Sequence, residues 1–251
     1  MGFRERVERV IGKSDLLLEI VDSRFPNETR NELIEERVKE KKKELIIVVN
    51  KSDLVSKRNA LKVKKELSKF FRVVFVSGKE KKGISRLRNA IKAFAGRKEK
   101  KVVVGVIGYP NTGKSSIINA LKGKVVARTS ITAGYTKGEQ FISLTKNVLL
   151  VDSPGIIPFE ERDELLLALV GAKNPSKLED AESAAEKVIE LLMENNPKKL
   201  ERRYGIELKE KNAGEVLEWI AMKKGRLLKK GIPDVNAVSK QIVLEWQKGK
   251  L

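Results

Sequence analysis

The sequence predicts an α/β domain, with a mostly parallel sheet flanked by helices, followed by a small all-helical domain. Three observations support this. Short apolar runs alternate with amphipathic charged stretches, which is typical of a parallel sheet covered by helices. Continuous runs such as LIIVV and VVVGVI indicate strands buried on both faces. After Pro158 the strand pattern stops and amphipathic helical segments take over.

The strands and helices are predicted from the types of residue and from the spacing of the apolar residues. Runs of Val, Ile and Leu predict strands at Leu16–Val21, Leu45–Val49, Val73–Val76, Val102–Ile107, Gln140–Leu144 and Val148–Val151. Stretches with helical period lie between them, at Arg30–Lys43, Lys57–Phe70, Ile84–Phe94 and Lys114–Leu121. Five further helices are expected in the second domain, at Arg162–Val170, Leu178–Asn195, Pro197–Tyr204, Ala213–Lys224 and Val235–Gln247. We place the two domains at residues 1–161 and 162–251.

Charge is unevenly distributed along the chain. The 251 residues hold 53 Lys and Arg against 34 Asp and Glu, a formal net charge of +19. Residues 37–101 hold 23 basic and 6 acidic residues, whereas residues 166–251 hold 17 and 13. Such a segment fits a polyanionic partner, because lysines release counterions from phosphate backbones, although a lysine-rich surface also serves solubility. The lysines expected near phosphates are Lys57, Lys62, Lys64, Lys65, Lys81 and Lys82.

Composition excludes several classes of site. The sequence contains no Cys and no His, which rules out disulfides, Cys₄ zinc sites, Ser-His-Asp triads and a histidine general base. No apolar run approaches the roughly 18 residues of a membrane helix, and residues 1–13 are too charged for a signal segment. We therefore expect a cytoplasmic protein without a membrane partner.

A phosphate-binding loop is predicted between a strand and a helix. Residues 108–115 read GYPNTGKS, a complete G-x-x-x-x-G-K-[ST] motif, although a Gly-rich turn can arise incidentally. Backbone N–H groups at a helix N-terminus cradle phosphates, Lys114 neutralises the β/γ oxygens, and the Ser115 hydroxyl ligates magnesium. The residues expected around the phosphates are Pro110, Asn111, Thr112, Gly113, Lys114, Ser115 and Ser116.

A second phosphate motif follows the strand that ends at Val151. Residues 152–155 read DSPG, a D-x-x-G arrangement some 40 residues after the loop, although such a tetrapeptide is often only a turn. Asp152 is expected to hold magnesium, directly or through water. The Gly155 N–H is expected to meet the γ-phosphate.

Two loops predict a guanine site. Residues 50–53 read NKSD: the Asp53 carboxylate accepts from guanine N1–H and the exocyclic amine, Lys51 lies along the ring, and Asn50 braces the loop. Further on, Ser77-Gly78-Lys79 resembles the S-A-K loop whose backbone N–H reads guanine O6. Both follow strands, where ligands bind in open α/β sheets.

The order of these motifs is unusual, because NKSD and SGK precede the phosphate loop and DSPG. In this order the sequence resembles the circularly permuted P-loop GTPases of the YlqF/RbgA type, which act in ribosome assembly. The resemblance also covers residues 15–30 (DLLLEIVDSRFPNETR), 132–141 (TAGYTKGEQF), 152–158 (DSPGIIP) and the tail segments 167–171, 201–206 and 231–251. It implies a permuted GTPase domain and a C-terminal helical domain that resembles RNA-binding modules.

The resemblance also implies roles for single residues. Thr136 is the switch threonine that contacts magnesium and the γ-phosphate, so that Lys114, Thr136 and Gly155 form the catalytic set. Asn111 matches an asparagine that helps to hold potassium, or else it is a turn former before Gly113. The cofactors expected are GTP and GDP as substrate and product, magnesium and potassium.

Hydrolysis is expected to be slow without a partner. Ile156 stands where Ras-like proteins carry a water-orienting Gln, and the histidine of bacterial relatives is missing, so no general base is assigned. We expect a GTP-hydrolysing switch that binds ribosomal RNA of large-subunit precursors. The alternatives are a nucleotide-gated RNA-binding module with negligible hydrolysis, and a GTPase acting in tRNA modification.

Overall fold

The computed structural model describes residues 3–123, 140–152, 163–208 and 211–251. The chain divides into two compact units, which we call the sheet unit (residues 1–53 and 60–160) and the helical unit (residues 54–59 and 161–251). The predicted boundary between residues 161 and 162 lies outside the described residues and stays a prediction. The two units are described separately below.

A single sheet forms the centre of the sheet unit. In the described residues it has six strands in the order β3-β2-β1-β4-β6-β5. Their bounds are β1 Leu16–Asp22, β2 Glu44–Asn50, β3 Arg72–Phe75, β4 Val102–Ile107, β5 Gln140–Thr145 and β6 Val148–Asp152. All neighbours pair in parallel except β5 and β6, which are antiparallel. The mostly parallel sheet is therefore confirmed, with each strand end within one residue of its predicted position.

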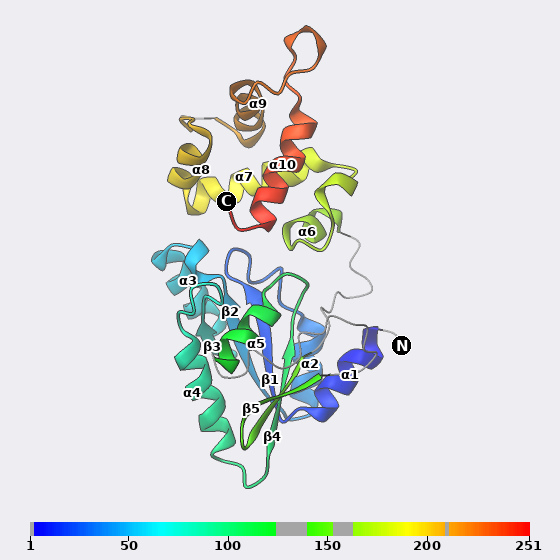
Figure 1. Cartoon of the computed structure of the whole chain (residues 1–251), viewed down its shortest axis with the longest axis vertical. Helices are drawn as coiled ribbons and strands as arrows, with labels where there is room; N and C mark the ends of the chain where they lie inside the picture. Colours follow the sequence, from blue (N-terminus) through cyan, green and yellow to red (C-terminus); the bar gives the residue numbers. More distant parts are fainter. Residues whose placement is uncertain (1–2, 124–139, 153–162, 209–210) are drawn as a thin grey trace. The chain divides into compact units, whose positions relative to one another are not determined.

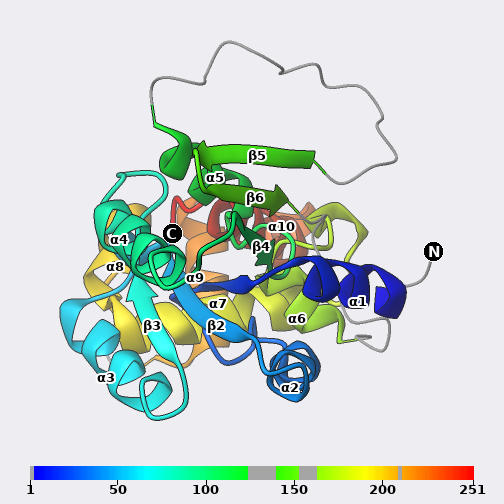
Figure 2. The same ribbon diagram turned by 90° about the horizontal axis from the view of Figure 1, so that it is seen from below.

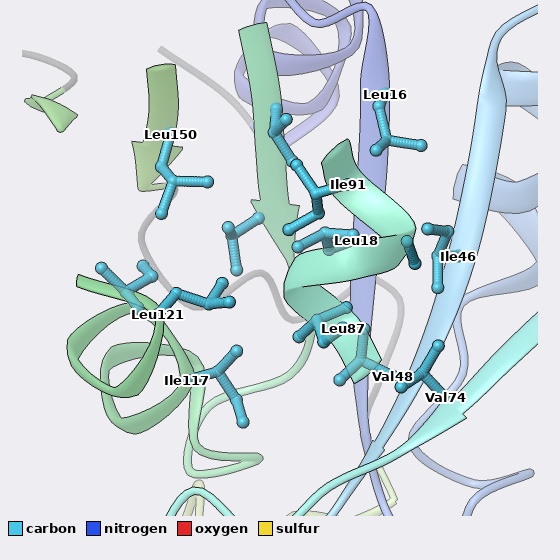
Figure 3. Close-up of a cluster of buried hydrophobic side chains, with 14 of the residues drawn as sticks. Leu16, Leu18, Ile46, Val48, Val74, Leu87, Ile91, Ile117, Leu121 and Leu150 are labelled. Atoms are coloured by element: carbon cyan, nitrogen blue, oxygen red, sulfur yellow. The ribbon is translucent and has the colours of Figure 1, made fainter. Parts of the chain in front are cut away.

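Helices cover both faces of this sheet (Figure 2). They are α1 Phe3–Lys13, α2 Glu32–Glu40, α3 Lys57–Leu67, α4 Ile84–Ala95 and α5 Lys114–Lys122. The apolar side chains of α4 and α5 join one buried cluster, and those of α1, α2 and α3 pack on the opposite face. In Figure 3, Leu16 and Leu18 of β1 lie beside Ile91 of α4, and Leu121 of α5 lies beside Leu150.

One helix of the sheet unit was not predicted, and two others are shorter than predicted. The sequence analysis did not predict α1, because charged residues obscured its buried apolar face of Val7, Val10 and Ile11. The predicted helix at 30–43 is shorter, because the Asn31 side chain caps α2 by accepting from the Ile34 N–H. The helix predicted to reach Phe70 ends at residue 67.

The helical unit consists of short helices that pack around α7 (Figure 1). Its helices are α6 Glu164–Leu169, α7 Ala181–Asn195, α8 Pro197–Tyr204, α9 Ala213–Lys223 and α10 Val235–Gln247. All five predicted helices are present, and α7 starts later than predicted because the Asp180 side chain caps it. Trp246 of α10 is buried and donates its indole N–H to the Leu169 carbonyl at 3.1 Å. Within the described part of the chain, no helix is long and apolar enough to cross a membrane.

Candidate functional site

The predicted motifs meet at the carboxyl edge of the sheet. Because β1, β2, β4 and β6 are parallel, their last residues lie at the same edge, with Asp22 paired to Asn50 and Val106 paired to Asp152. The 108–113 loop leaves β4 at this edge, and the 77–79 loop follows β3. In open α/β sheets this edge is where ligands bind.

The 108–113 loop has a backbone that only particular residues adopt. Gly108, Asn111 and Gly113 have positive φ angles of 145°, 59° and 96°. A Cβ on Gly108 would lie 2.4 Å from the Ile20 carbonyl oxygen, and one on Gly113 would lie 2.2 Å from the Asn50 side-chain nitrogen. Both glycines are therefore required by close packing as well as by conformation. The left-handed backbone of Asn111 agrees with its role as a turn former, and potassium binding by this residue stays a prediction.

Lys114 places its positive charge inside this loop. Its side chain is 8% exposed, and its Nζ donates to the carbonyl oxygens of Gly108 at 3.0 Å and Tyr109 at 2.7 Å. Ser115 and Ser116 follow in the first turn of α5 and are exposed. A helix N-terminus and a buried ammonium group together favour an anion in the loop.

Asn50 links three loops. It is 2% exposed; its Nδ2 donates to the Thr112 carbonyl at 2.7 Å, and its Oδ1 accepts from the Gly78 N–H at 3.0 Å. The side chain thereby joins the NKSD loop to the phosphate loop (residues 108–113) and to the SGK loop (residues 77–79). These contacts agree with the prediction that Asn50 braces the NKSD loop.

Lys51 is held against the sheet by an acidic neighbour. Its backbone has a φ of 60°, and its Nζ lies 2.7 Å from Asp22 Oδ2. Burial lowers the pKa of Lys51. Burial of Asp22 by itself would raise the pKa of that carboxyl, but Arg24 and Lys51 outweigh burial and lower it to about 2. The two groups form a charged pair at the start of the NKSD loop.

A backbone hydrogen bond links the NKSD loop to the end of β3, from which the SGK loop leaves. The Ser52 N–H donates to the Val76 carbonyl at 3.1 Å, which ties the two loops together. Ser77 is fully buried and its Oγ accepts from the Glu80 N–H at 3.0 Å. Asp53 and Lys79 are exposed, so that Asp53 is open to a ligand at this edge.

Part of the predicted site lies outside the described residues. This holds for Thr136, Gly155 and Ile156, and for the side chain of Asp152, whose backbone ends β6. The exposed Ser115 hydroxyl beside the phosphate loop, and Asp152 ending a strand that pairs with β4, fit a site for magnesium. The magnesium ligands themselves stay predictions.

Comparison with known proteins gives the family. The family model described as RsgA GTPase matches residues 12–161, more than half of the chain. The chain belongs to this GTPase family. A second model, described as 50S ribosome-binding GTPase, matches residues 103–224. With the order of its motifs, the protein is a P-loop GTPase of the circularly permuted type, as the resemblance to YlqF/RbgA implied.

Sequence relatives agree with this assignment. The GTPase is 40% identical over 248 residues to the GTP-binding protein MJ1464 of Methanocaldococcus jannaschii, a match that covers 98% of this chain and 65% of that protein. It is 38% identical to nucleolar GTP-binding protein 2 of Saccharomyces cerevisiae, over 97% of this chain and 51% of the yeast protein. The chain thus spans less than two thirds of these relatives.

Two solved structures share the fold. GDP-bound YlqF from T. maritima matches the GTPase with a TM-score of 0.67 and 27% identity, covering 98% of this chain and 95% of that one. GNP-bound YlqF matches with a TM-score of 0.64 and the same identity, covering 98% and 94%.

The sequence analysis assigned no role to Asp22 or Ser23. Both belong to the 15–30 segment that carried part of the family resemblance. One signal in the sequence could have indicated that Asp22 belongs to the site: it is an aspartate directly after an apolar strand, at the edge of the sheet where the other motifs lie. Both residues contact the NKSD loop.

Proposed function

We propose that this GTPase is a GTP-hydrolysing switch that binds ribosomal RNA on precursors of the large ribosomal subunit and leaves after hydrolysis. One observation supports the nucleotide part above others: the Asn50 side chain bonds the phosphate loop and the SGK loop at once. Phosphate recognition and base recognition are thereby parts of one site. The ribosomal part is supported by relatives described as 50S ribosome-binding and nucleolar GTPases, and by the basic charge of the chain.

Lys114 has the main role in binding the phosphates. Its Nζ contacts two loop carbonyls, at Gly108 and Tyr109, and on binding it exchanges them for β- and γ-phosphate oxygens. Thr136 and the Gly155 N–H, which lie outside the described residues, would contact the γ-phosphate. Ser115, Thr136 and Asp152 would hold magnesium, which would supply positive charge to the phosphates. Asn111 would help to hold potassium, which would supply a further positive charge.

Two surfaces of the described residues suit an RNA backbone. One is α3, whose lysines at positions 57, 62, 64 and 65 are exposed. The other is in the helical unit, where Asn196, Lys198, Lys199, Arg202, Arg203 and Lys250 line a hollow of about 530 Å³. Lysine and arginine at these places contact phosphates without reading the sequence of the bases.

Guanine selectivity is tested by binding. We expect the protein to bind GDP much more tightly than ADP in calorimetric titrations. Asp53→Asn removes the carboxylate that accepts from the guanine N1–H and amine, and should remove that preference. Equal affinities for GDP and ADP in the wild type would contradict the guanine assignment.

The switch is tested by turnover. GTP hydrolysis is measured in potassium and in sodium buffer, with and without large ribosomal subunits. We expect slow turnover alone, and strong stimulation by subunits in potassium. Tight GTP binding with no stimulation would favour the nucleotide-gated RNA-binding module, which the absence of His and the presence of Ile156 also favour.

A further inference from the structure

The carboxyl end of β1 contacts the loop that is expected to bind guanine. Ser23 follows the last residue of this strand, and it makes two hydrogen bonds to the NKSD loop. Its N–H donates to the Asn50 carbonyl at 2.9 Å, and its Oγ–H donates to the Lys51 carbonyl at 2.7 Å. These bonds lie on either side of the Lys51 Cα, whose φ of 60° is in the left-handed region that residues other than glycine adopt uncommonly.

Asp22 contacts the same lysine through its side chain. The carboxylate is 1% exposed, and its Oδ2 lies 2.7 Å from Lys51 Nζ and 2.9 Å from Arg24 Nη2. Its Oδ1 accepts from the backbone N–H and the Nε–H of Arg24, both at 3.1 Å. Four donors thus occupy the carboxylate.

Asp22 itself is fixed by the turn that follows it. Its N–H donates to Thr29 Oγ1 at 2.9 Å, and the Thr29 hydroxyl donates to the Phe25 carbonyl at 2.9 Å. Thr29 is fully buried. The DSRFPNETR stretch is therefore a rigid support, from which Asp22 and Ser23 both reach the NKSD loop.

We propose that Asp22 and Ser23 are positioning residues for guanine binding: Ser23 fixes the backbone of the NKSD loop, and Asp22 anchors the ammonium group of Lys51 so that its methylene stem lies flat along the base. This inference rests on the proposed function, because it assumes that the loop binds guanine. A lysine stem can pack along an apolar surface, and holding its charged end in place beforehand reduces the side-chain entropy that is lost when it does so. Asp53 selects the base, whereas Asp22 acts through Lys51.

A double-mutant cycle tests this role. GDP affinity is measured by calorimetry for the wild type, Asp22→Asn, Lys51→Met and the double variant. Asp22→Asn should weaken GDP binding on the order of 10-fold, the usual size for a lost bond to a charged group. In the Lys51→Met background the same change should have little further effect, because its partner is gone. If the two effects multiply, Asp22 does not act through Lys51 and the proposal is overturned.

Three controls distinguish this role from a general effect of charge or of folding. Asp15→Asn removes a carboxylate from the opposite end of β1, where it pairs with Lys100, and should leave GDP affinity unchanged. If Arg24→Met, and not Lys51→Met, cancels the effect of Asp22→Asn, the carboxylate only supports its own turn and the proposal is wrong. If Asp22→Asn does not fold, the release of GDP is measured for Ser23→Ala instead. We expect GDP to be released several-fold faster than from the wild type. An unchanged rate of release would contradict the proposal. A wild type that binds no GDP would contradict the proposed function itself, whereas multiplying effects in a protein that binds GDP contradict only the inference.

Discussion

The side-chain nitrogen of Asn50 donates a 2.7 Å hydrogen bond to the carbonyl oxygen of Thr112, 62 residues further along the chain. One residue is the last of β2, and the other lies in the loop after β4. Because β1 lies between these two strands, the bond reaches across the end of the central strand. A movement of the phosphate loop therefore changes the surroundings of the NKSD loop directly.

Removal of this side chain should affect both stability and binding. Asn50→Ala leaves the Thr112 carbonyl and the Gly78 N–H without their partner at a buried position. We expect a loss of about 2 kcal/mol in the free energy of unfolding, measured by urea denaturation, and weaker GDP binding. Asn119→Ala, on the exposed side of α5, is the matched control and should change neither quantity. Unchanged GDP affinity in Asn50→Ala would show that the loops keep their positions without it.

Gly113→Ala should abolish nucleotide binding. The new Cβ would lie 2.2 Å from Asn50 Nδ2, and the φ of 96° disfavours any side chain. Loss of GDP binding in calorimetry, with far-UV circular dichroism close to that of the wild type, is the expected result. Gly12→Ala in α1, where a Cβ meets nothing within 4 Å, should instead stabilise the protein by up to about 1 kcal/mol. Retained GDP affinity in Gly113→Ala would contradict the described loop geometry.

The buried Glu19 should make the stability of the protein depend on pH. Burial in β1 and the nearby Glu35 raise the pKa of Glu19 well above the ordinary 4.5, and Glu19 Oε2 has no hydrogen-bond partner among the described residues. The folded state therefore keeps a proton that the unfolded state loses, and stability falls as the pH rises above about 4.5. Glu19→Gln cannot ionise, so its melting temperature should exceed that of the wild type by a margin that grows as the pH rises above about 4.5. Glu36→Gln, exposed on α2, should show no such growing margin; a constant margin for Glu19→Gln would contradict the raised pKa.

The basic hollow of the helical unit should bind RNA phosphates. Lys198→Glu combined with Arg202→Glu reverses two of its charges, and should weaken binding to large-subunit ribosomal RNA while GDP affinity stays the same. The slope of affinity against salt concentration should also become shallower, because fewer counterions are released. Lys187→Glu on α7, which lies outside the hollow, is the control, and it should weaken binding much less. Equal losses of RNA affinity in the hollow variant and in Lys187→Glu would indicate a general effect of charge, without a defined binding surface.

Most of the sheet unit could be predicted from the sequence. The strands β1, β2 and β4 consist mainly of Val, Ile and Leu that are buried on both faces, so that their composition indicates strands. The phosphate loop was predictable because its residues occur at fixed spacing. The backbone conformation requires glycine at positions 108 and 113, and Lys114 supplies the positive charge inside the loop. The helix α1 was missed because its few buried residues, Val7, Val10 and Ile11, stand among charged neighbours.

Two features of the candidate site and surface depend on contacts between distant residues, and the sequence analysis did not predict them. The Asp22–Lys51 pair joins residues 22 and 51 through the pairing of β1 with β2, and no spacing in the sequence marks it. The net charge of residues 166–251 is small, yet the lysines and arginines of α8 line one hollow together with Lys250. A sum of charges over a segment averages out such a local excess.

The strand order also has a consequence for folding during synthesis. β1, β2 and β3 pair with one another within the first 75 residues, so the half that holds NKSD and SGK can assemble early. The other edge of β1 then stays open until β4, which begins at Val102, is made. An unpaired edge of this kind invites pairing with other chains. If the first half does pair during synthesis, one side of the apolar central strand stays exposed until the phosphate-binding half pairs with it.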